Sequence, residues 1–115
     1  MPNDCWNNLT ITGVREEIDR FVANEFIGAP AWAYTIQHRG VEGIQFRLWS
    51  SSFPDYVWLE GLLIRYNTLW VKNVWQEEGG RAGIWIGDVE KGVQHFEWED
   101  LCLEERAHRF RQSAT

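Results

Sequence analysis

The sequence is poor in the residues that mark several classes of protein. It has two cysteines and three prolines among 115 residues, and Cys5 and Cys102 form no CxxC pair. Two such distant cysteines are most simply free thiols in a reducing compartment. The start, MPNDCWNN, lacks the basic end and apolar middle of a secretory signal, and no apolar run is long enough to span a membrane. We therefore expect a cytoplasmic protein that does not interact with membranes.

Basic residues are also in deficit. Eleven Lys and Arg stand against 17 Asp and Glu, which gives a net charge of −6. Nonspecific binding to nucleic acid or to an anionic membrane depends on Lys and Arg, so this balance argues against both. The excess is local, because residues 88–105 contain seven acidic residues and one basic residue.

The motifs that carry chemistry are absent as well. His38, His95 and His108 are scattered, and Cys102 with His108 does not match the spacing of metal ligands. The glycines form neither GxGxxG nor a loop ending in GK[ST]. A nucleophilic pair such as Cys5 with His95 would have to meet in space, and no local signature supports it. We expect no enzyme activity, no cofactor and no metal site.

Hydrophobic periodicity predicts the secondary structure. Alternating apolar residues predict strands at 6–12, 44–49, 69–78 and 84–88. Helical spacing predicts one helix from Val14 to Phe26 and another that starts at Ser52, with a proline in its first turn. Residues 34–38 and 93–98 are expected to be extended, and a helix is expected from about Asp100.

This order predicts a single α+β domain over residues 1–115. The pattern β-α-β-α-β-β fits a ferredoxin-like antiparallel sheet with both helices on one face and the first and third strands in the middle. Residues 93–115 would form a C-terminal extension, an extended piece plus a helix, that packs on the sheet or mediates contacts.

Two blocks of sequence also resemble a known family. MPNDCWNNLTITG is similar to the opening signature of the YubB-type ferredoxin-like domain, which occurs in small proteins of phages, plasmids and enterobacteria. FRLWSSSFPDYVWLEGLLIRYNTLWVKNVWQEEGGRAG resembles the second block of that family. Asp4 departs from the family, which usually has an aromatic residue at this position. The resemblance implies the fold and an origin in a mobile element, and it implies no catalytic residue.

The eight tryptophans raise the question of what covers the sheet. If Leu9 and Ile11 face the helices, the opposite face collects several aromatic and basic side chains. These are Trp6, Arg47, Trp49, Trp70, Lys72 and Trp85. Residues 69–75 are apolar on both sides and could exchange faces. Four tryptophans of about 150–250 Å² each exceed the apolar patch that a soluble monomer normally exposes.

Three candidates could cover this face of the sheet. The first is the chain's own C-terminal extension, the second is another copy in a homodimer, and the third is a bound partner. An aromatic sheet with Arg47 and Lys72 beside it is similar to a surface on which the bases of single-stranded RNA or DNA stack. The net charge and the absence of the glycine-aromatic pattern of RNA-recognition sheets argue against this alternative.

The acidic C-terminal stretch carries the leading functional hypothesis. Its residues are Glu97, Trp98, Glu99, Asp100, Glu104 and Glu105. Charge runs are usually only solvated helix faces. A negative ridge can also dock on a basic groove in place of nucleic acid. The hypothesis is a non-enzymatic phage or mobile-element protein that binds a host protein and inhibits a defence or nucleic-acid-processing complex, of the anti-CRISPR or anti-restriction type.

Overall fold

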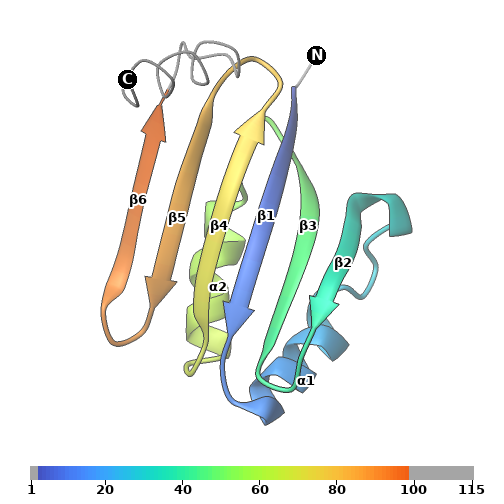
Figure 1. Ribbon diagram of the computed structural model, residues 1–115, viewed down its shortest axis with the longest axis vertical. Coiled ribbons are helices and arrows are strands. Elements are labelled where there is room, and N and C mark those ends of the chain that lie inside the picture. The colour runs from blue at the N-terminus through green and yellow to red at the C-terminus, as the bar shows by residue number, and fades with distance from the viewer. Residues whose placement is uncertain (1–2, 99–115) are drawn as a thin grey trace, which may run out of the picture.

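Six strands form one antiparallel sheet in the computed structural model, which describes residues 3–98. The strands are β1 (Asp4–Thr12), β2 (Tyr34–Arg39), β3 (Gly43–Ser51), β4 (Trp70–Glu77), β5 (Ala82–Asp88) and β6 (Gly92–Trp98). Their order is β2-β3-β1-β4-β5-β6, so the first and third predicted strands, β1 and β4, lie in the middle as expected (Figure 1). The predicted α+β class is confirmed.

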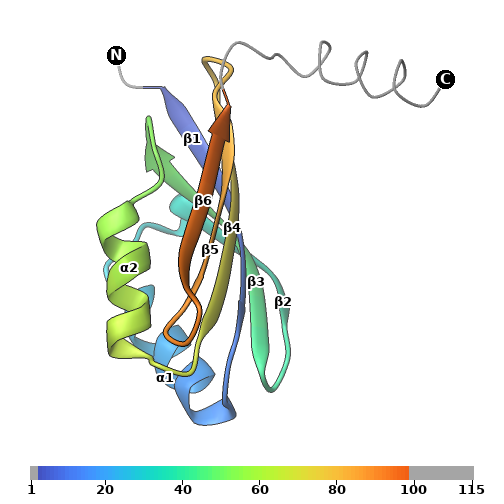
Figure 2. The same cartoon turned by 90° about the vertical axis from the view of Figure 1, so that its left-hand side faces the viewer.

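Two helices, α1 (Arg15–Glu25) and α2 (Tyr56–Arg65), cover the same side of the sheet (Figure 2). A short 3-10 helix, η1 (Ala31–Ala33), precedes β2. In α1, Ile18 and Phe21 are one turn apart and both are buried, as the periodicity predicts. No helix in the described part of the chain is long and apolar enough to cross a membrane.

The start of α2 differs from the prediction. Ser52 is not the helix cap, because its φ of 69° places it in a turn before the helix. The cap is Asp55, whose carboxylate accepts a hydrogen bond from the backbone N–H of Trp58 at 3.0 Å. Pro54 comes just before the cap residue Asp55, so the proline lies outside the helix and not in its first turn.

The core lies between the helices and the sheet face that carries Leu9 and Ile11, as predicted. Its central residues are Leu9, Ile11, Ile18, Phe21, Ile44, Phe46, Leu59, Leu62, Val71 and Trp85. The region expected to be extended at 34–38 is a full edge strand, β2, with a register shift between Ile36 and His38. The region at 93–98 is the other edge strand, β6. The helix expected from about Asp100 lies outside the described residues.

A half-buried carboxylate connects the two helices. Glu25, at the end of α1, accepts hydrogen bonds from the Tyr66 hydroxyl at 2.7 Å and the Trp58 indole N–H at 2.8 Å, and it forms an ion pair with Arg65 at 3.0 Å. Burial raises the pKa of Glu25, but these hydrogen bonds and the Arg65 charge outweigh it, so that the pKa lies below its ordinary value of 4.5. The folded state therefore favours the ionised carboxylate.

We expect the free energy of unfolding to fall as the pH drops below about 4.5, in part through Glu25. A carboxyl whose pKa is lowered by folding contributes stability above its unfolded pKa, and this contribution is lost as the pH falls through the folded pKa. Glu25→Gln should lower the free energy of unfolding at neutral pH by about 1.5–3 kcal/mol, the value of hydrogen bonds to a charged group. It should also flatten the acid limb, which is the part of the stability curve where the free energy of unfolding falls with decreasing pH. Urea unfolding at a series of pH values measures both. Glu60→Gln, on the exposed side of α2, is the control, and an unchanged acid limb in Glu25→Gln would contradict the assignment.

Candidate functional site

The side of the sheet away from the helices is called here the open face. Across β1 and β3, Trp6 pairs with Trp49 and Asn8 pairs with Arg47. Across β1 and β4, Thr10 pairs with Lys72 and Thr12 with Trp70. Because paired residues point to the same side of a sheet, five of the six predicted side chains share this face on the three adjacent strands β3, β1 and β4. These are Trp6, Arg47, Trp49, Trp70 and Lys72.

Trp85 is the exception, and its predicted place on the open face is wrong. It pairs with Asn73, which is buried on the helix side, and only 1% of Trp85 is exposed. Its neighbours Ile84 and Ile86, expected in the core, are half-buried on the open face. The register of the β4–β5 hairpin decides this, since a shift of one residue moves every side chain of a strand to the other face.

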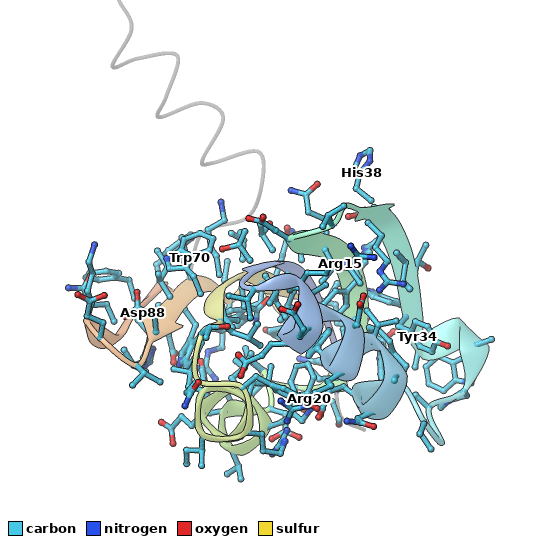
Figure 3. The ribbon with its side chains drawn as sticks, turned by 90° about the horizontal axis from the view of Figure 1, so that it is seen from below. Arg15, Arg20, Tyr34, His38, Trp70 and Asp88 are labelled. Atoms are coloured by element: carbon cyan, nitrogen blue, oxygen red, sulfur yellow. The ribbon has the colours of Figure 1, made fainter. Side chains whose placement is uncertain are left out.

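The open face carries two more aromatic residues, which are not among the six predicted for it. Phe96 and Trp98 of β6 pair with Ile84 and Ala82 of β5, and 61% of Phe96 is exposed. The alternation in VQHFEW was the available signal, because it places both rings on one side. In the view along the sheet from below, His38 of β2 extends away from the helices, whereas Arg20 of α1 lies beside them (Figure 3).

The aromatic side chains at the centre of the open face are held in place by polar partners. The guanidinium carbon of Arg47 lies 4.5 Å from the centre of a Trp6 ring, which is a cation–π contact. The indole N–H of Trp49 donates a hydrogen bond to the Asp4 carboxylate at 2.8 Å. Trp32 of η1 adds an edge-to-face contact with Trp49, with ring centres 5.2 Å apart. These contacts fix the orientations of the Trp6 and Trp49 rings on the surface.

A shallow depression of about 230 Å³ lies beside Trp6. Asn8, Arg47 and Gln76 line it together with the acidic residues Asp4, Glu77 and Glu78, so hydrogen-bond donors and acceptors surround the edge of an aromatic ring. This combination suits a planar, polar group, which would contact the ring with its face and the amides with its edge.

The charges of the open face are mixed. On β3, β1 and β4 it carries two cations, Arg47 and Lys72, against one carboxylate, Asp4, and the carboxylates of Glu77 and Glu78 also line the depression beside Trp6. Within residues 3–98, neither cation forms an ion pair. Both are therefore available to an anionic ligand, despite the net charge of −6.

The predicted acidic surface is described only in part. Glu97 lies on the helix side of β6, where it accepts a hydrogen bond from Arg81 at 2.8 Å and one from the Tyr56 hydroxyl at 3.2 Å. Burial and the Glu97 charge raise the pKa of Tyr56 to about 12. Trp98 lies on the opposite side of the strand. The other four acidic residues lie outside the described residues. They are Glu99, Asp100, Glu104 and Glu105.

The structure also places the cysteine and histidine side chains that were considered for catalysis and metal binding. Cys5 is buried, and burial raises the pKa of its thiol, which is the opposite of what a nucleophile needs. The ring of His95 packs on Tyr56 instead. Among residues 3–98, no group of three or more His, Cys, Asp or Glu side chains is arranged to hold a metal ion.

Comparisons of the chain with protein-family models, with curated proteins and with solved structures found no match.

Proposed function

We propose that this protein binds single-stranded nucleic acid through the open face. The observation that carries the proposal is the pairing of Trp6 with Trp49 on the adjacent strands β1 and β3, with Arg47 stacked on Trp6. Aromatic rings on central strands are the usual platform for stacking unpaired bases, and Arg planes serve the same purpose.

We also propose that the domain is ferredoxin-like, and the strand order supports this. The elements β1-α1-β2-β3-α2-β4 with the order β2-β3-β1-β4 correspond to that arrangement, and β5 and β6 would extend it at the β4 edge. RNA-recognition sheets of this kind carry their stacking aromatic residues on the two central strands. Here Trp6 and Trp49 occupy β1 and β3.

The polar groups around Trp6 suggest how a base would be held. A base stacked against Trp6 or the Arg47 guanidinium would place its edge near Asn8 and Gln76, which line the same depression. Amide side chains can donate to and accept from any base, so contacts of this kind favour unpaired bases over duplex without a strong sequence preference.

A mobile-element origin and membership of the YubB-type family also remain proposals. The opening block of residues 1–13 and the second block of residues 46–83 support them. The inhibitor hypothesis stays a prediction, because most of the acidic segment on which it depends lies outside the described residues.

A titration with oligothymidylate and oligouridylate strands tests the proposed function. We expect saturable quenching of tryptophan fluorescence, because bases would stack on rings of the open face. Two cations that neutralise phosphates predict a slope of about −1.4 in a plot of log K against log salt, at about −0.7 per phosphate for single strands. Arg47→Gln should weaken binding and reduce the slope by about 0.7.

The matched control is Arg20→Gln, because Arg20 lies on α1 beside the other face of the sheet (Figure 3). It should leave affinity and slope unchanged. A flat titration with both strands would contradict the proposed function. If the chain then captured another protein from a bacterial lysate, and the complex survived nuclease treatment, the inhibitor hypothesis would be favoured instead.

A further inference from the structure

A cavity lies on the other side of the sheet, between the sheet and the two helices. The end of α1, residues 53–55 and the first turn of α2 bound it, and Asn7 and Asn73 of the two middle strands contribute to its lining. Its volume is about 520 Å³, within the range of about 300–1,000 Å³ that small-molecule pockets occupy. Leu9 and Phe26 are among the apolar residues of its walls.

The orientations of the two amides follow from their partners. The Nδ2 of Asn7 donates to the Leu48 carbonyl oxygen at 3.0 Å and to the Ser50 hydroxyl at 2.8 Å. The Ser50 hydroxyl uses its own hydrogen for the Phe53 carbonyl oxygen, so it can only accept from Asn7. The Asn7 carbonyl oxygen therefore faces Asn73, whose Nδ2 donates to it at 2.8 Å.

In the described part of the chain, these hydrogen bonds leave one acceptor atom, Asn73 Oδ1, without a donor. Asn73 is 1% exposed, and its Oδ1 has no hydrogen-bond partner within residues 3–98. Buried polar atoms in folded proteins nearly always have a partner, and an unmet one is destabilising. Asn73 also lines the cavity, so a molecule in the cavity with an O–H or N–H group could supply the missing donor after a small shift of the amide that uncovers its buried Oδ1.

The charged residues around the cavity are already engaged. Glu25 forms an ion pair with Arg65 and accepts a hydrogen bond from the Trp58 indole. Asp55 accepts from the backbone N–H of Trp58 as the cap of α2. Neither carboxylate is left to pair with a cationic ligand, so the cavity suits an uncharged molecule.

We infer that this cavity binds a small, neutral, largely apolar molecule that carries one hydroxyl or N–H donor, with the donor bonded to Asn73 Oδ1. Most of the cavity lies on the helix side of the sheet, although Trp49 of the open face also lines it. The two sites are told apart by Asn73, which lines the cavity but not the depression beside Trp6, and by Arg47, which lines that depression but not the cavity.

Phenol and anisole are the probes, because they have the same ring and only phenol can donate a hydrogen bond. The experiment follows the side-chain amide signals of Asn7 and Asn73 and the indole N–H signal of Trp58 in NMR spectra of the full chain. We expect saturable shifts of these signals with phenol, and an affinity for anisole that is weaker by about tenfold. Absence of saturable shifts with phenol, or equal affinity for the two probes, would overturn the inference.

Two variants separate the donor contact from simple filling of space. Asn73→Leu removes the acceptor and should reduce the ratio of the affinities for phenol and anisole from about ten to nearly one. An unchanged preference would overturn the role of Asn73. Ala29→Phe narrows the cavity at the loop after α1 and should weaken both probes by the same factor. Because Ala29 lies in this loop and the two amides lie on β1 and β4, the variant keeps the test informative if Asn73→Leu fails to fold. Undiminished phenol binding in it would place the probe elsewhere.

Discussion

Replacing Trp85 by alanine is expected to lower the free energy of unfolding by about 3–5 kcal/mol, the usual cost of truncating a large buried aromatic residue. Trp85 is 1% exposed and belongs to the core between α2 and the sheet. Its removal would leave a cavity that the surrounding strands and helix can fill only in part. Urea denaturation followed by circular dichroism measures the loss.

Trp70→Ala is the matched comparison, because Trp70 is a strand tryptophan on the open face and is only half-buried. Its truncation should cost clearly less stability than that of Trp85. Equal losses for the two variants would mean that both rings are buried to the same extent. That result would contradict the assignment of the two faces.

The difference between these two tryptophans shows where sequence patterns reach their limit. On β1 and β3 apolar and polar residues alternate, so the positions of Leu9, Trp6 and Arg47 could be predicted. In β5 the pattern IWI has apolar residues on both sides, and it does not say which side faces the helices. That choice depends on the number of residues in the turn after β4, because hairpin loop length sets the register.

The strand β4 was ambiguous for a related reason. Val71 and Trp75 face the core, but Asn73 lies between them and is also buried. A polar residue at a core position weakens the alternation from which faces are predicted. Its burial is stabilised by the hydrogen bond to Asn7 on the neighbouring strand at 2.8 Å. That pairing spans 66 residues of sequence, so no local pattern could indicate it.

Most residues of the candidate site could be predicted from the sequence, but the extent of its aromatic surface could not. Trp6, Arg47, Trp49, Trp70 and Lys72 do share one face. Phe96 and Trp98 extend the aromatic surface because β6 pairs with β5, which a local pattern does not reveal. The same pairing turns Glu97 to the helix side. Strand pairing therefore separates an acidic and an aromatic neighbour that are adjacent in sequence.

Trp6→Ala and Trp49→Ala are each expected to weaken the binding of oligothymidylate. Stacking of one base on an aromatic side chain contributes about 1–3 kcal/mol in alanine substitutions, which corresponds to a loss of about fivefold to a hundredfold in affinity. Fluorescence anisotropy of a labelled strand is the suitable measurement, because it does not depend on the tryptophan that is removed. Phe53→Ala, on an exposed ring that contacts Arg81, is the control and should bind like the wild type.

The double variant of Trp6 and Trp49 distinguishes two ways of binding. The two residues are directly paired across β1 and β3, so one base could contact both rings or each ring could hold its own base. One shared base predicts that the double variant loses less affinity than the two single losses combined, because the second substitution removes a contact that is already gone. Two separate bases predict additive losses. Wild-type affinity in both single variants would instead exclude the paired tryptophans as the stacking platform, and with them the observation on which the proposed function rests.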